Sequence, residues 1–180
     1  MAIRNPGEHG FDRLYGEHSV LVYNYLRRRL RSDSDAEDAT VETFRRVHSG
    51  IKKFRGECSE KVWVMRIATN VAYRSMQKEA KHRYVSLDDM GPAEAERLSA
   101  ALGSTVESEV ANRSLVEGLL ASLPDVQRAA VWLRVGIEYT DEEVAQILDV
   151  PVGTVKSWVW RSLARLRKTC AGLEQEVLTQ

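Results

Sequence analysis

Apolar residues recur along this chain at the three- and four-residue spacing of amphipathic helices, whereas the strict alternation typical of β-strands does not occur. One stripe consists of Phe11, Leu14, Tyr15, His18, Val22, Tyr25 and Leu26. It predicts a first helix ending near Arg31, with His18 packed at the edge of the core. The acidic residues that follow Ser32 predict the start of a second helix, which runs to about Ser49, because carboxylates complement the dipole at a helix N-terminus. The chain is therefore expected to be all-α.

A polar stretch at 51–60, which contains Gly56, predicts a loop after the second helix. The third helix is expected to bury Trp63, Ile67 and Val71. An adjoining face of this helix carries Arg66, Asn70, Tyr73 and Gln77. Residues 84–112 are rich in Asp, Glu, Ser, Ala and Gly, which is typical of a flexible, exposed linker. This composition predicts two small helical domains, 1–83 and 113–180, joined by an acidic linker.

The second domain has the pattern of a helix-turn-helix. A first helix is predicted by the spacing of Leu115, Leu119, Leu120 and Leu123, and Pro124 begins another that ends by Gly136. Thr140 and Glu143 have the spacing of a capping box at the start of a short apolar helix. The stretch 149–153 predicts a tight turn into a last helix. The apolar stripe of that helix consists of Val155, Val159, Leu163 and Leu166.

The net charge of zero conceals a segregation of charge along the chain. The 180 residues include 26 basic and 26 acidic ones, but 1–83 has 17 basic against 11 acidic, and 84–112 has one basic against six acidic. Between 153 and 168 there are five basic residues and no acidic one. Chance clustering is one explanation, and two separate contacts with a polyanion are the other.

Several classes of protein are disfavoured by what the chain lacks. No run approaches the ~18–20 apolar residues of a membrane span, and the N-terminus has no apolar core of a secretory signal, so we expect a cytoplasmic protein. Cys58 and Cys170 have no C-x-x-C partner, which favours free thiols over a disulfide or a zinc site. The four histidines are scattered, and no carboxylate cluster, catalytic triad or phosphate-binding glycine loop is present. We therefore expect no metal, no cofactor and no enzymatic activity.

The last helix has the surface expected of a DNA-recognition helix. When successive residues are placed 100° apart around the helix axis, the apolar stripe falls on one side. The other side carries Lys156, Ser157, Trp160, Arg161 and Lys168. An ordinary solvated surface helix is the alternative, but an outward tryptophan and the lack of acidic residues weigh against it. The pattern therefore favours insertion into a DNA major groove.

The first domain carries residue types that bind single-stranded nucleic acid. The loop 51–60 supplies cations and an aromatic ring, and the neighbouring helix face supplies Arg66, Asn70 and Tyr73. Cations suit phosphates, rings stack on bases, and amides reach base edges. Trp63 is either a core residue, which its helical spacing favours, or a stacking platform.

The chain resembles the bacterial sigma factors of the extracytoplasmic-function type, over about 11–83 and 113–170. The motifs that carry this resemblance are residues 35–38 (DAED), 42–44 (ETF), 54–56 (FRG), Trp63 with 66–68 (RIA) and Asn70, Leu123 with Pro124, and 150–157 (VPVGTVKS). The resemblance implies an alternative sigma factor with a region 2-like first domain and a region 4-like second domain, for which core RNA polymerase, promoter DNA and an anti-sigma factor are the expected partners.

The resemblance also implies roles for individual residues. Core polymerase would be bound by Asp35, Asp38, Glu42 and Phe44. The melted minus-ten element would be held by Phe54, Arg55, Gly56, Lys61, Trp63, Arg66, Asn70 and Tyr73. The minus-thirty-five element would be read by Thr154, Lys156, Ser157, Trp158, Trp160, Arg161 and Arg165. The acidic linker would pass through the polymerase channels near the RNA exit path.

The chain departs from the family pattern at Glu60 and Lys61, where Phe and Arg are frequent, at Asp149, which replaces a turn glycine, and at Trp158, which replaces an arginine. A stand-alone helix-turn-helix regulator is the alternative to a sigma factor. It explains the C-terminal half equally well, but it does not explain a basic N-terminal unit with an acidic helix start beside a base-holding loop.

Overall fold

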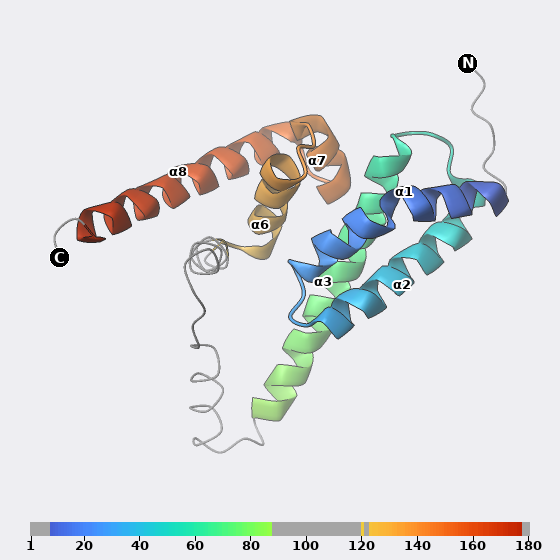
Figure 1. The fold of residues 1–180 in the computed structure, drawn as a ribbon, viewed down its shortest axis with the longest axis horizontal. Helices are drawn as coiled ribbons and strands as arrows, with labels where there is room; N and C mark the ends of the chain where they lie inside the picture. The colour runs from blue at the N-terminus through green and yellow to red at the C-terminus, as the bar shows by residue number, and fades with distance from the viewer. Residues whose placement is uncertain (1–7, 88–119, 121–122, 178–180) are drawn as a thin grey trace. The chain divides into compact units, whose positions relative to one another are not determined.

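The computed structural model describes residues 8–87, 120 and 123–177, which belong to two compact units, Met1–Asp88 and Asp89–Gln180. Both units are built from helices, and no strand occurs among the described residues (Figure 1). The expectation of an all-α fold is confirmed. Within the described part of the chain, no helix is long and apolar enough to cross a membrane.

The first unit consists of α1 (Glu8–Arg27), α2 (Asp33–Gly50), a short 3₁₀ turn η1 (Ile51–Lys53) and α3 (Glu60–Leu87) (Figure 1). The three α-helices pack pairwise against one another. Helix α1 ends four residues before the predicted Arg31, because the chain turns there and buries Leu30, whose N–H donates to the Leu26 carbonyl at 2.8 Å.

Helix α3 is longer than the sequence predicted. It continues to Leu87, because no helix breaker precedes Gly91, so the first four residues of the predicted linker 84–112 are helical. The remainder of that linker lies outside the described residues, as do Leu115 and Leu119 of the helix predicted before Pro124.

The core of the first unit lies between the three helices. It consists mainly of Leu14, Val22, Tyr25, Leu26, Ala36, Ala39, Phe44, Val47, Val62, Val64, Met65, Ala68, Val71 and Ala72. The predicted buried stripe of α3 was wrong for Trp63 and Ile67, which are half-buried, and right for Val71. Because α3 packs against both α1 and α2, it buries a wide arc rather than one narrow stripe.

The second unit contains α6 (Asp125–Val131), a π-helical turn η2 (Trp132–Gly136), α7 (Asp141–Leu148) and α8 (Val152–Val177). Pro124 is the N-cap of α6, and the helical segment ends at Gly136 as predicted. A side chain at Gly136 would place its Cβ 2.9 Å from the Trp132 ring, so the close approach of this ring requires glycine.

Helices α7 and α8 form a helix-turn-helix, and the predicted capping box fixes its start. The Thr140 hydroxyl accepts from the Glu143 N–H at 3.1 Å, and the Glu143 carboxylate accepts from the Thr140 N–H at 2.9 Å. The turn begins at Asp149, whose φ of 56° lies in the left-handed region. Asp tolerates this conformation better than most residues, which explains how it replaces a turn glycine.

Candidate nucleic-acid and protein interfaces

A groove of about 800 Å³ lies between α2 and α3 of the first unit. Its walls carry the three acidic residues that were predicted to bind a partner, Asp35, Asp38 and Glu42. The opposite wall, from α3, carries Arg74, Lys78 and Glu79, which the sequence analysis did not select. We call this feature the α2–α3 groove. Its mixed charge suits a polar protein surface better than a nucleic acid.

The carboxylates of α2 are held in different ways. Ser32 is the N-cap of α2, and its hydroxyl accepts from the Asp35 N–H at 3.0 Å, so Asp35 lies in the first turn. Glu42 accepts from Arg45 Nε at 2.6 Å and from Arg46 Nε at 2.7 Å. These two guanidinium groups lower the pKa of Glu42 to about 2. Glu42 is thus ionised at neutral pH, with its charge largely balanced within the helix.

Phe44, which was predicted to bind core polymerase, is buried in the free chain. Only 3% of this residue is exposed, and its ring packs edge-on against Tyr15, with 4.8 Å between ring centroids. The ring therefore holds α2 against α1. The family resemblance had grouped Phe44 with Glu42, but side chains two positions apart on a helix point about 160° away from each other.

The loop 54–59 is attached to α3 through an aromatic stack. The rings of Phe54 and Trp63 are stacked, with centroids 4.8 Å apart and 27° between the ring planes. Trp63 also covers Gly50, where an added Cβ would lie 3.1 Å from the ring. Trp63 is therefore neither a fully buried core residue nor a free platform. Gly56, with a φ of 74°, makes the bend beside the exposed Arg55.

The predicted single-strand-binding face of α3 forms one stripe. Trp63, Arg66, Asn70 and Tyr73 recur every three or four residues, which places them along the same side of the helix. Asn70 and Tyr73 are exposed, whereas Lys61, Trp63 and Arg66 are half-buried. Together with the loop 54–59, this stripe forms a surface that we call the loop–α3 face.

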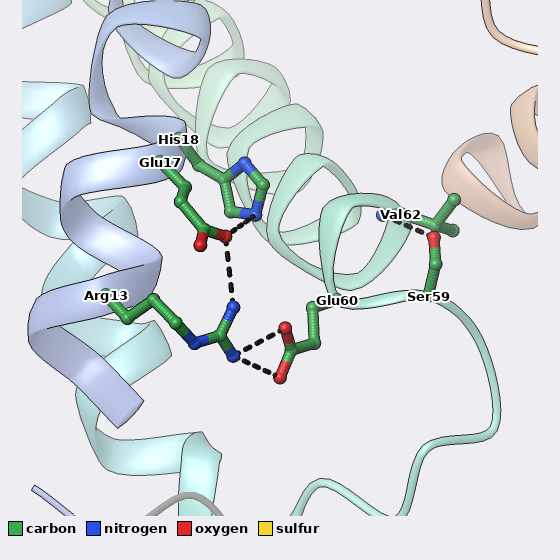
Figure 2. Close-up of polar contacts among 6 residues, drawn as sticks. All are labelled: Arg13, Glu17, His18, Ser59, Glu60 and Val62. Atoms are coloured by element: carbon green, nitrogen blue, oxygen red, sulfur yellow. Dashed lines mark hydrogen bonds and ion pairs between the residues drawn. The ribbon is translucent and has the colours of Figure 1, made fainter. Parts of the chain in front are cut away.

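An ion-pair cluster ties the start of α3 to α1 (Figure 2). Arg13 Nη2 donates to both carboxylate oxygens of Glu60, at 2.8 and 2.7 Å, and Arg13 Nη1 donates to Glu17 at 3.0 Å. Beside the cluster, burial lowers the pKa of His18, and this effect outweighs the negative charge of Glu17, which raises the pKa. The sequence analysis missed Arg13, because a contact between residues 47 positions apart leaves no local signal.

The outer face of α8 carries the predicted basic residues. Lys156, Arg161 and Arg165 are exposed, and Trp160 is 71% exposed. Arg161 is folded along the helix, where its Nη2 donates to the Ser157 hydroxyl at 2.6 Å and its Nε to the Ser157 carbonyl at 3.1 Å. The opposite side is anchored by Val155, which is fully buried. The predicted core side of α8 is confirmed for Val155 only, because Val159, Leu163 and Leu166 are half-buried.

Three members of the predicted set lie closer to the protein than expected. Thr154, Ser157 and Trp158 are half-buried. A second groove of about 570 Å³ adjoins the outer face, and its lining includes Lys156 and Trp160 together with Arg134, Val135 and Glu138. The sequence analysis missed these last three residues, since they come from η2 and the turn after it.

Among the described residues, no group of three or more His, Cys, Asp or Glu side chains is placed to hold a metal ion. Cys58 is a free cysteine, and burial raises the pKa of its thiol.

The second unit contains a helix-turn-helix with a basic outer helix face, and the first unit carries cations and aromatic rings on the loop–α3 face. This combination is typical of a DNA-binding transcription protein. The family model described as Sigma-70 region 2 matches residues 14–82, and the model described as Sigma-70, region 4 matches residues 113–166. The chain belongs to the extracytoplasmic-function (ECF) family of RNA polymerase sigma factors, which direct promoter-specific initiation of transcription.

Known proteins resemble the chain over most of its length. It is 31% identical to the ECF RNA polymerase sigma factor SigM of Mycobacterium tuberculosis, over 89% of this chain and 76% of the relative. It is 33% identical to the ECF RNA polymerase sigma-E factor of Salmonella typhimurium, over 80% and 81%. The fold is similar to that of the sigma factor RpoE from Bartonella quintana, solved with the anti-sigma factor NepR, with a TM-score of 0.66, 22% identity and coverage of 88% and 94%.

These similarities decide between the two functions left open by the sequence. A stand-alone regulator would account for the second unit alone, whereas the matches to sigma factors extend over both units.

Proposed function

We propose that the chain divides the work of a sigma factor among three surfaces, the first of which binds core RNA polymerase. This surface is the α2–α3 groove, with Asp35 and Asp38 as its accessible carboxylates. Asp38 is exposed, and Asp35 is held by the Ser32 cap at the rim of the groove. A fixed array of carboxylates would select a basic helical surface on the polymerase. Phe44 contributes by holding α2 in place.

The second surface, the loop–α3 face, holds unpaired bases of the minus-ten element. Arg55 is exposed at the bend of the loop, and Asn70 and Tyr73 are exposed on α3. Lys61 and Arg66 add positive charge beside the Phe54–Trp63 stack. Such a surface combines cations for phosphates with a ring and an amide for bases, which is the chemistry that single strands require.

The third surface is the outer face of α8, which reads the minus-thirty-five element in the major groove. Lys156, Trp160, Arg161 and Arg165 are its exposed members, and Thr154, Ser157 and Trp158 flank them. The observation that carries the proposal is the charge of this face: five basic residues and no acidic one occur between 153 and 168 in a chain whose net charge is zero.

Two further expectations accompany this division of labour. We propose that an anti-sigma factor competes for the α2–α3 groove, since a sigma factor of similar fold was solved with one. We also propose that the chain acts in the cytoplasm, where bacterial RNA polymerase works, and that the polymerase rather than this chain supplies the catalytic chemistry.

The decisive experiment separates the loop–α3 face from α8. The chain is assembled with core polymerase on a promoter found by run-off transcription, and opening is followed by permanganate reactivity of thymines on linear DNA and on the same DNA with a pre-melted bubble. We expect Arg55→Ala to slow opening of the linear duplex while leaving upstream duplex binding unchanged, because unpaired bases exist only after melting.

Lys53→Ala is the matched control, since it removes an equal exposed charge two residues away. If Arg55→Ala is equally impaired on the linear and bubble DNA and in upstream binding, the loop has no specific melting role and the proposed division is wrong.

A further inference from the structure

We propose that Arg13 and Glu60 are positioning residues, which hold the start of α3 and the attached loop 54–59 in the conformation that accepts unpaired bases. The inference rests on the proposed function of the loop–α3 face. It adds a contribution of α1, the helix farthest in sequence from any residue assigned to DNA.

The geometry of the pair is specific. One nitrogen of Arg13, Nη2, contacts both oxygens of Glu60, at 2.8 and 2.7 Å (Figure 2). The other terminal nitrogen contacts Glu17, which lies one turn further along α1. The pair joins two different helices, so it restrains their relative position rather than the shape of either one.

The loop is held at both ends by α3. At its start, Phe54 stacks on Trp63, and at its end, Ser59 caps the helix by accepting from the Val62 N–H at 3.3 Å (Figure 2). Glu60 is the first residue of α3 and follows Ser59 directly. A shift of this helix end relative to α1 would therefore move Trp63 and the whole loop together.

Stability alone does not account for this arrangement. The side chains of Arg13 and Glu60 are 46% and 33% exposed, and exposed ion pairs contribute little to the free energy of folding. Their effect is expected instead on placement, because a binding surface loses affinity when its groups shift by about 1 Å. A purely electrostatic role is the alternative, in which Arg13 merely neutralises a carboxylate near the DNA.

Charge reversal distinguishes these two roles. The variants Arg13→Glu, Glu60→Arg and the double exchange are assembled as full chains with core polymerase on a promoter that the wild-type holoenzyme opens. Opening is measured by permanganate reactivity, binding to the upstream duplex is measured separately, and thermal unfolding reports the fold. Glu17→Gln is the control, since it changes a partner of Arg13 without altering the contact with Glu60.

We expect each single reversal to slow opening by about three- to fivefold, with upstream binding and unfolding temperature unchanged. The double exchange, which restores an opposite-charge pair, should return to within about twofold of wild type, as should Glu17→Gln. Glu60→Arg is the most informative variant, because it adds positive charge beside the DNA. If Glu60→Arg slows promoter opening, the result supports the positioning role. If it speeds opening, the result supports the purely electrostatic role and overturns our inference.

A double exchange that remains as slow as the single variants also overturns the inference. The inference would also be overturned if the unfolding temperature decreased in parallel with the rate of opening, since the pair would then be merely structural. Failure of the wild-type holoenzyme to open any promoter would instead count against the proposed function itself.

Discussion

Neighbouring residues of α2 face in different directions, so single substitutions should separate docking from folding. Asp38 is exposed at the α2–α3 groove, whereas Phe44 is buried. We predict that Asp38→Lys weakens competition for core polymerase without changing the urea midpoint of unfolding, because a reversed charge repels a basic partner. Asp38→Lys is a cleaner test than Glu42→Lys, which would also remove the ion pairs with Arg45 and Arg46. Unchanged competition by folded Asp38→Lys would exclude this docking face.

Phe44→Ala should behave in the opposite way. Removing a buried aromatic ring leaves a cavity beside Tyr15, so the free energy of unfolding should fall by about 3–5 kcal/mol. Urea unfolding measures this loss. Any loss of polymerase binding should disappear once the comparison is restricted to the folded fraction. A variant of normal stability that fails to bind would show that Phe44 does contact the partner.

His18 provides a prediction about pH. Burial lowers its pKa below the ordinary 6.5, which means that the unfolded chain takes up the proton first. Stability from neutral His18 is therefore complete above pH 6.5 and falls as the pH drops through 6.5 toward the lower folded pKa, by at most about 1.4 kcal/mol per pH unit. We predict that urea unfolding at pH 7.5 and 5.5 gives a smaller difference for His18→Gln than for wild type. Equal differences would contradict a neutral, half-buried His18.

Helix α7 has only eight residues, so its capping box satisfies a large share of the helix's N-terminal N–H groups. We predict that Thr140→Ala lowers the free energy of unfolding by about 1 kcal/mol, since the Glu143 N–H loses its acceptor. Thr140→Ser, which keeps the hydroxyl, should remain near wild type. Thermal unfolding of the full chain, followed by Trp fluorescence, provides the measurement, since three of the four tryptophans, Trp132, Trp158 and Trp160, lie in the second unit. Equal losses for the two variants would mean that the methyl group matters rather than the cap.

Sequence patterns predicted elements well wherever their determinants are local. The capping box of Thr140 and Glu143, the basic outer face of α8 and the buried Val155 all depend on residues within one or two turns. Contacts between distant segments were not predictable. The stack of Phe54 on Trp63 and the pair of Arg13 with Glu60 arise only when helices meet. The same cause explains the wide buried arc of α3, which packs on two helices at once.

At the scale of the whole molecule, the chain consists of two compact units, and in the proposed division of labour each would bind DNA through one small surface. Because the net charge of the chain is zero, general attraction to the phosphate backbone is weak. Affinity must then come from both surfaces acting together, which requires that something holds them at the spacing of the two promoter elements. Core polymerase, bound to the first unit, would raise the effective concentration of the second unit at its site.

We therefore predict that the isolated chain binds promoter duplex with a Kd of about 10⁻⁴–10⁻⁶ M, the range of non-specific binding, and little preference for sequence. With core polymerase, binding should become specific, and Arg161→Ala should then cost about 1–3 kcal/mol at one position of the upstream element. Fluorescence anisotropy with matched and scrambled duplexes, with and without polymerase, measures both quantities. Lys156→Ala is the companion variant, because a lysine that contacts phosphate weakens all sequences alike. Tight, sequence-specific binding by the isolated chain would show that α8 needs no polymerase, and the second unit would then act as a regulator in its own right.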